Sequence, residues 1–113
     1  MDMEKVNAFM ERSRRMRMND NFEVPEYADA YWNDLSDFIV SDLAGAIEFL
    51  CNDDSCTADV FVEWSSVFDD VARKSQSREF VEALKVAARR FPKACEEYSI
   101  VKCIEFAEDE LLD

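Results

Sequence analysis

Three residue types are missing or scarce in this sequence, which has no histidine, one glycine (Gly45) and two prolines (Pro25 and Pro92). Without histidine, Ser-His-Asp and Cys-His catalysis are excluded, and so are the common imidazole metal sites. An all-β domain needs many turn residues, which this chain lacks. One glycine is also too few for the Gly-rich phosphate loops of Walker or Rossmann type. These absences argue against a β fold and against the commonest nucleotide-binding machinery.

Long hydrophobic runs are absent as well. No apolar run approaches the roughly 18 residues that are needed to span a bilayer. Residues 1–18 are charged throughout and lack the apolar core of a secretory signal. The chain has 113 residues, of which 49% are hydrophobic and 35% are charged, as in a single globular domain. We therefore expect one domain over residues 1–113, in the cytoplasm and without a membrane partner.

A third absence is regional, because residues 19–70 contain fourteen acidic residues and no lysine or arginine. Residues 1–18 carry a net charge of +2 and residues 71–113 a net charge of −1, so the total of −13 comes from this middle region. A compact stretch of one charge sign repels itself. It is either a solubilising surface or a docking face for a basic partner, and its charge disfavours direct binding of nucleic acid.

Apolar residues recur every three to four positions along most of the chain, which predicts amphipathic helices. Residues 3–17 are predicted to form a basic helix or arm. It either packs on the domain or frays at the terminus, or it binds a membrane surface or a groove of a partner. Residues 26–50 form one long helix or two, with a break near Ser41, which is suited to cap the second. Further helices are expected at residues 58–74, 78–90, 92–98 and 100–112. The predicted fold is therefore all-α, a compact bundle or short helical-repeat-like stack of about five to six helices.

Helix ends and core positions are clearest in the second half of the chain. Thr57 and Ser77 are good N-caps, and loops are expected at residues 19–25 and 51–57, which are rich in Asn, Asp and Ser. On the helices expected at residues 58–74 and 100–112, the core-facing positions are Val60, Phe61, Trp64, Val67, Phe68 and Val71, then Ile100, Cys103, Ile104, Ala107 and Leu111.

Four cysteines raise the question of a metal site or disulfides: Cys51, Cys56, Cys95 and Cys103. Four residues separate the first two and seven separate the last two, which does not match the spacing of a zinc ribbon, and there is no histidine to complete a mixed site. The paired aspartates of the chain do not fit an EF-hand loop either. We expect reduced thiols, no metal and no cofactor, and neither a nucleophile–base pair nor a cofactor motif points to an enzyme.

The candidate partner-binding residues lie on two acidic helical stripes, with one aromatic residue beside the first. They are Asp29, Asn33 and Asp37 with Trp32 on the helix expected from residue 26, and Asp59, Glu63 and Asp70 on the helix expected at residues 58–74. An aromatic residue at the edge of an acidic face is either an interface anchor or simply partly buried. If the two stripes face the same way, they form one extended negative surface.

The runs that carry a family resemblance consist of packing and capping residues. They are Cys56-Thr57-Ala58, Trp64-Ser65-Ser66-Val67-Phe68-Asp69-Asp70, Gln76-Ser77-Arg78-Glu79-Phe80, Phe91-Pro92 and Tyr98-Ser99-Ile100. Over about residues 22–112 the chain resembles small acidic immunity proteins of bacterial contact-dependent and polymorphic toxin systems. The resemblance implies a cytoplasmic protein that neutralises a cognate toxin domain in a tight one-to-one complex. It implies no binding residues, because the interfaces of such proteins diverge together with their toxins.

The charge pattern is consistent with the same function. The cleft of a nuclease toxin is lined by Lys and Arg, because it binds polyphosphate, and carboxylates offered to such a cleft promote fast and specific association. We therefore predict an immunity protein with a basic partner, no catalytic activity and no small-molecule substrate. Two other functions stay open, namely a nucleic-acid mimic that occupies a DNA-binding protein and a structural or adaptor subunit of a helical complex.

Overall fold

The computed structural model describes residues 1–19 and 24–112, of which 82% are helical and none lies in a strand. The all-α prediction is confirmed, but these residues form eight helices, more than the five to six expected. The helices are α1 (Met3–Met18), α2 (Pro25–Ser41), α3 (Leu43–Asn52), α4 (Ala58–Ser65), α5 (Phe68–Ser75), α6 (Arg78–Arg90), α7 (Pro92–Tyr98) and α8 (Ile100–Asp109). Most of the loop expected at residues 19–25 lies outside the described residues.

Two helices, not one, cover residues 26–50, and the residue between them is Asp42. The Asp42 carboxylate accepts a hydrogen bond from the Gly45 N–H at 3.2 Å and so caps α3. The cap expected at Ser41 is therefore wrong by one residue, and the Ser41 hydroxyl instead donates to the Phe38 carbonyl at 2.6 Å. A Cβ at Gly45 would collide with the Asp42 carboxylate, so the single glycine of the chain leaves room for this cap.

The helix expected at residues 58–74 is also divided, because α4 ends at Ser65 and α5 begins at Phe68. The N–H groups of Ser66 and Val67 bond to carbonyls only three residues back, which tightens and ends the last turn of α4. The Ser65 hydroxyl also donates to a carbonyl three residues back, at 2.5 Å, and serine hydroxyls compete in this way with helical backbone bonds. The prediction of one continuous helix here is wrong.

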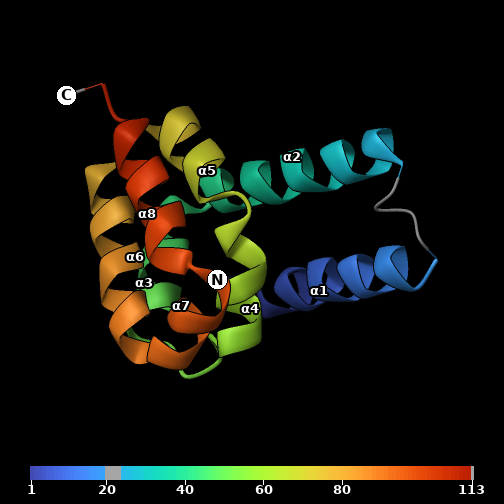
Figure 1. The fold of residues 1–113 in the computed structure, drawn as a ribbon, viewed down its shortest axis with the longest axis horizontal. Helices are drawn as coiled ribbons and strands as arrows, with labels where there is room; N and C mark the ends of the chain where they lie inside the picture. The colour runs from blue at the N-terminus through green and yellow to red at the C-terminus, as the bar shows by residue number, and fades with distance from the viewer. Residues whose placement is uncertain (20–23, 113) are drawn as a thin grey trace.

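The core lies where α3 packs on α6 and α5 packs on α8, with α2 lying against α5. Figure 1 shows α7 at the lower end of this group and α4 along its side, next to α1, while α1 and α2 run antiparallel and extend to one side. The radius of gyration is 13.3 Å, close to the value of about 13 Å expected for one domain of this length.

Aromatic side chains fill the core. All six residues that were predicted to face inward from residues 58–74 are buried, which confirms that part of the prediction. The ring centroids of Phe49 and Trp64 lie 5.3 Å apart, and those of Phe61 and Phe68 lie 5.5 Å apart across the break between α4 and α5. Truncating a buried aromatic residue of this kind to alanine typically costs about 3–5 kcal/mol, so these contacts fix the positions of both helices.

The basic N-terminal segment is a helix that is docked on the domain by its side chains. Val6 and Met16 of α1 are 1% and 8% exposed. The Phe9 ring lies 6.1 Å from the Tyr31 ring and 5.2 Å from the Phe38 ring, measured between centroids. Of the alternatives left open by the sequence, packing on the domain is the one observed. None of the helices in the described part of the chain is long and apolar enough to cross a membrane.

Candidate functional site

Basic residues from outside the acidic region neutralise part of it. The region contains no base of its own, but α1 and α5, on either side of it, supply four. The ion pairs are Arg12–Asp34 at 2.9 Å, Arg17–Glu63 at 3.4 Å, Arg73–Asp70 at 2.6 Å and Lys74–Asp37 at 2.9 Å. The fold therefore brings some of the flanking positive charge onto the acidic helices, which local sequence composition does not reveal.

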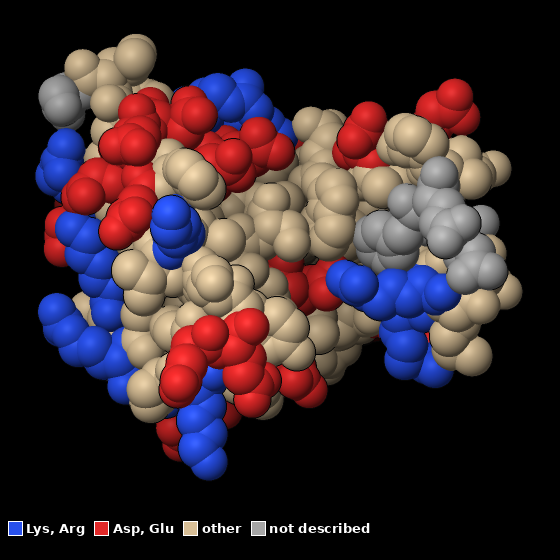
Figure 2. Space-filling model, viewed as in Figure 1, with Lys and Arg blue, Asp and Glu red and all other residues tan. Residues whose placement is uncertain are grey.

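Other carboxylates of the region stay exposed and outside these pairs. In residues 24–70, Glu26, Asp29, Asp54 and Asp59 are exposed and take part in none of the ion pairs of the described residues. Figure 2 shows acidic side chains gathered over α5 and the end of α8, and again over α7 and the start of α4, with one basic side chain and otherwise mainly uncharged surface between the two groups. This face is therefore negative at two edges and carries little charge between them.

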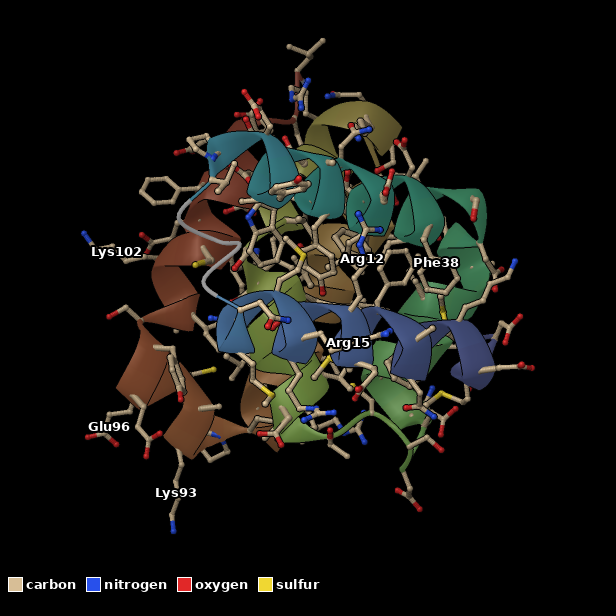
Figure 3. The ribbon with its side chains drawn as sticks, turned by 90° about the vertical axis from the view of Figure 1, so that its right-hand side faces the viewer. Arg12, Arg15, Phe38, Lys93, Glu96 and Lys102 are labelled. Carbon is tan, nitrogen blue, oxygen red and sulfur yellow. The ribbon has the colours of Figure 1, made fainter. Side chains whose placement is uncertain are left out.

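Arg12 lies between α1 and α2 and links them. Figure 3 shows Arg12 reaching from α1 toward α2, with Phe38 in the space between the same helices. The Arg12 guanidinium pairs with Asp34 and stands 5.3 Å from the centroid of the Tyr31 ring. A cation in such a place contributes on the order of 1 kcal/mol. Charge therefore adds to the apolar contacts that hold α1.

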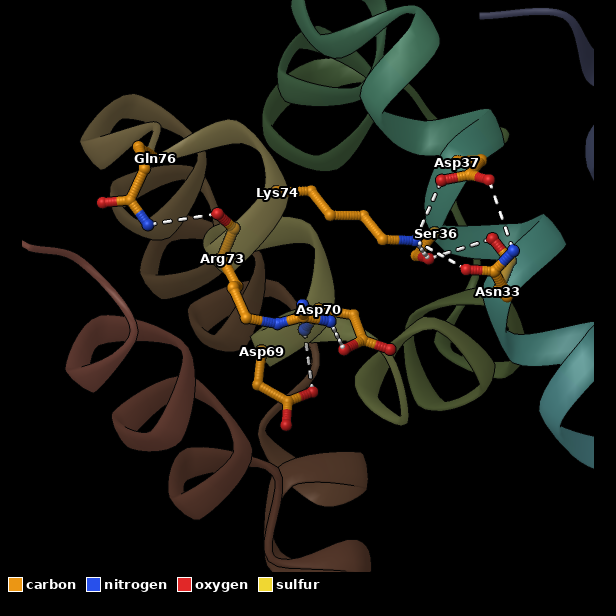
Figure 4. Close-up of polar contacts among 8 residues, drawn as sticks. All are labelled: Asn33, Ser36, Asp37, Asp69, Asp70, Arg73, Lys74 and Gln76. Atoms are coloured by element: carbon orange, nitrogen blue, oxygen red, sulfur yellow. Dashed lines mark hydrogen bonds and ion pairs between the residues drawn. The ribbon is translucent and has the colours of Figure 1, made fainter.

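Lys74 fixes one of the two predicted acidic stripes to the fold. Its ammonium donates to Asn33 Oδ1 at 3.0 Å, to Ser36 Oγ at 2.6 Å and to Asp37 Oδ1 at 2.9 Å, and Figure 4 shows the side chain crossing from α5 to α2. Ser36 is fully buried and donates to the Asn33 carbonyl at 3.0 Å. Asn33 and Asp37, proposed from sequence as partner-binding residues, therefore hold α2 against α5.

Asp29, Trp32 and Asp70 differ from one another in their surroundings. Asp29 lies one turn before Asn33 on α2 and is exposed. Trp32 is partly buried, and its ring stands edge-on to the Tyr31 ring with centroids 4.7 Å apart. Asp70 lies on α5 and pairs with Arg73 of the same helix. Of these three, Asp29 has the most accessible charge for a partner.

Glu63 links three helices from a nearly buried position. Its side chain is 10% exposed, and its carboxylate accepts a hydrogen bond of 2.9 Å from the hydroxyl of Tyr31, a residue with no exposed surface. Arg17 of α1 approaches the same carboxylate at 3.4 Å. Burial raises the pKa of Tyr31, and the negative charge of Glu63 raises it further. Glu63 thus connects α4 to α1 and α2, and the tyrosine remains a neutral donor.

A groove runs beside Glu63, between α1 and α4. It has a volume of about 770 Å³, and its lining includes Met10 and Arg14 of α1, Asp59 and Val62 of α4, Tyr98 at the end of α7 and Cys103 of α8. A smaller hollow of about 150 Å³ continues it past the break between α4 and α5, where Asp69 and Phe106 join the lining. Ser65, Ser66 and Cys103 line both. We call the two together the α4 groove.

Asp59 and Asp69 are the carboxylates of the α4 groove that are outside the ion pairs of the described structure. The basic residues at its α1 side are already engaged, since Arg14 donates to Glu11 at 3.0 Å and Arg17 pairs with Glu63. The second predicted stripe, Asp59, Glu63 and Asp70, is therefore not one continuous surface. Asp59 and Glu63 line the groove, whereas Asp70 lies on α5 beyond the break.

Two exposed aromatic side chains border the groove, and sequence reasoning missed both. Tyr98 and Phe106 are each 58% exposed, and Val101 nearby in sequence is 53% exposed. The signal was present for α8, because Val101 and Phe106 fall off the apolar stripe that predicts its buried face. Large apolar residues outside a buried stripe are informative when they gather beside a groove.

The four cysteines differ in how far the fold buries them. All four are free thiols, and among the described residues no group of three or more His, Cys, Asp or Glu side chains could hold a metal ion. Burial raises the pKa of Cys56 to about 11. Burial also raises the pKa of Cys103, and the charge of Asp69 adds to the effect. Both thiols are therefore protonated and weakly nucleophilic near neutral pH.

Comparisons with known proteins identify no relative: no protein-family model matches the chain, and neither a curated protein nor a solved structure is similar to it.

Proposed function

We propose that this chain is an inhibitor of the immunity-protein type, which binds a basic toxin domain one to one and neutralises it. The observation that carries the proposal is the negative charge that remains after four bases from outside the acidic region have paired with it. Arg12, Arg17 and Lys74 are engaged in holding α1, α2, α4 and α5 together. Exposed carboxylates such as Asp29 and Asp59 remain for a partner.

The physical argument concerns what exposed carboxylates can and cannot do. Unpaired surface charges add little to stability, and a net charge of −13 on 113 residues makes the folded chain repel itself. The same charge attracts a positive protein and speeds its correctly oriented encounter. A nuclease toxin carries such a positive surface because it must bind polyphosphate. Neutralising it would be required in the cytoplasm, where its nucleic-acid substrate lies.

The test identifies the partner and then asks whether it is toxic. The tagged protein is used to isolate a stoichiometric partner from its native host, and the gene of that partner is expressed in a second host alone and together with this chain. We expect a partner with a strongly basic domain, growth arrest when it is expressed alone, and restored growth and a one-to-one complex when both are present.

Two results would overturn the proposal. A stoichiometric partner that binds DNA without being toxic would identify the chain as a nucleic-acid mimic. A partner that belongs to a larger helical assembly, with no change in growth when expressed alone, would identify an adaptor subunit. In either case the charge would still steer the encounter, but the function proposed here would be wrong.

A further inference from the structure

The α4 groove is a concave surface in which three features coincide. Its floor and walls come from five helices, α1, α4, α5, α7 and α8. Asp59 and Asp69 line it with carboxylates that are outside the ion pairs of the described residues. Tyr98 and Phe106 border it with large aromatic surfaces, each 58% exposed. Protein interfaces are enriched in such aromatic residues and are rimmed by polar ones.

We propose that the α4 groove is the docking site for a cationic, amphipathic segment of the protein partner. Lys or Arg side chains of that segment pair with Asp59 and Asp69, and its apolar side chains cover Tyr98 and Phe106. This inference rests on the proposed function, since it assigns the place at which the basic partner is held.

The charges that line the groove indicate that the segment bound there is positively charged. Among the described residues that line the groove, the cations are Arg14 and Arg17 of α1, and Arg14 is bonded to Glu11 and Arg17 to Glu63. An acidic segment would therefore find no available cation among these residues and would face the carboxylates of Asp59 and Asp69. A basic segment finds those carboxylates available. The acidic groups at the two edges of this face in Figure 2 favour the same sign.

The break between α4 and α5 explains why the groove extends along the surface. Because α4 stops at Ser65, the small side chains of Ser65 and Ser66 line the passage between the two hollows, with Cys103 of α8 opposite. Asp69 then follows in the first turn of α5 and Asp59 lies in the first turn of α4. The two carboxylates thus stand at different points along the groove, which suits an elongated occupant with spaced positive charges.

The experiment uses an 18-residue helical peptide of leucine and lysine as the probe, with a matched peptide of leucine and glutamate as its control. Binding to the full-length protein is followed by ¹H–¹⁵N NMR. Shifts are expected around Ser65–Asp69, at Tyr98 and at Cys103–Phe106 with the lysine peptide alone. The Cys103 thiol provides a second readout, because the bound peptide should slow its alkylation while Cys51, outside the groove, reacts as before.

Two matched variants separate this groove from the general negative charge of the protein. Asp59→Asn with Asp69→Asn removes two charges from the groove, and asparagine can still accept the bond that the Asp70 N–H makes to residue 69. Glu26→Gln with Asp54→Asn is the control, because it removes two exposed charges that lie outside the groove. The groove variant should weaken binding of the lysine peptide on the order of tenfold, and Phe106→Ser should weaken it similarly. The control variant should leave it within about twofold.

Equal weakening by the two charge variants, or shifts that lie elsewhere, would refute the groove as the docking site. That result would leave the proposed function standing if a basic toxin is still neutralised. Conversely, a groove that binds the lysine peptide as described, in a protein with no toxic partner, would refute the proposed function alone.

Discussion

Replacing Lys74 by methionine tests whether the bridge between α5 and α2 stabilises the fold. The change removes an ammonium that donates to Asn33, Ser36 and Asp37 but keeps an unbranched side chain of similar length. A hydrogen bond to a charged group contributes about 1.5–3 kcal/mol. The Lys74 side chain is 24% exposed and that of Asp37 is 61% exposed. Water can therefore hydrate the groups that lose their partner in the variant, which makes the loss of stability smaller. We expect the free energy of unfolding to fall by about 2 kcal/mol.

Urea denaturation followed by far-UV circular dichroism measures this loss. With a denaturant slope of roughly 2 kcal/mol per molar, the midpoint should fall by about 1 M with an unchanged slope, and the melting temperature by about 8 °C. Lys93→Met is the matched control, because Lys93 is exposed on α7 and points away from the molecule in Figure 3. Its effect should stay within about 0.5 kcal/mol.

Equal midpoints for Lys74→Met and Lys93→Met would refute the reasoning. The contacts of Lys74 would then be no more than weak surface pairs. Asn33 and Asp37 would be free to serve a partner, as the sequence alone suggests.

Three further predictions concern single residues. Glu63→Ala removes the acceptor of the Tyr31 hydroxyl and should lower the free energy of unfolding, measured in urea, by about 1–3 kcal/mol. Glu63→Gln keeps an acceptor and should lower it by less. A larger loss for Glu63→Gln than for Glu63→Ala would contradict this role of Glu63. Ser99 has a left-handed backbone conformation at φ 54°, which glycine adopts without strain, so Ser99→Gly should raise the melting temperature by a few degrees. Gln76→Gly should not raise it, because the glutamine side chain also bonds to the backbone of Glu110 and Leu112 at the end of the chain. The hydrogen bond from Lys85 holds the pKa of Glu108 below its usual 4.5. The Glu108 carboxylate therefore stabilises the fold at pH values above 4.5, and this contribution is lost as the pH falls through the lowered pKa. The melting temperature of Glu108→Gln should lie below that of the wild type near neutral pH and equal it in strong acid.

The all-α fold could be predicted because helical periodicity, capping residues and the lack of turn residues agree. Thr57 and Ser77 accept bonds from the N–H groups of Val60 and Phe80, as N-caps do. The breaks at Asp42 and Ser66 were harder to place. Apolar residues keep a spacing of three to four across both, so the pattern is the same for one helix or two. The exact breaks depend on side chains that bond to nearby backbone, and on packing with distant helices.

The candidate site could be predicted only in its charge. Lys74 is 41 residues from Asn33, and Arg17 is 46 residues from Glu63. No local sequence pattern shows that these bases pair with the acidic stripes. The sequence therefore could not distinguish carboxylates that stabilise the fold from carboxylates that are available to a partner. Asp59 was predicted from the sequence as a partner-binding residue, and the structure shows that it is exposed and lines the groove. Asp69 and Phe106 were missed because the groove forms between helices that are far apart in the chain.

The association rate with the basic partner, measured by stopped flow across a salt series, tests the central claim most directly. If exposed carboxylates steer the partner, the rate constant for the wild type should fall steeply, by roughly tenfold or more, between low and high salt. The Asp59→Asn and Asp69→Asn double variant should associate more slowly at low salt and show a flatter dependence. A rate that is insensitive to salt, and equal for wild type and variant, would contradict the account and leave the negative charge as a solubilising surface.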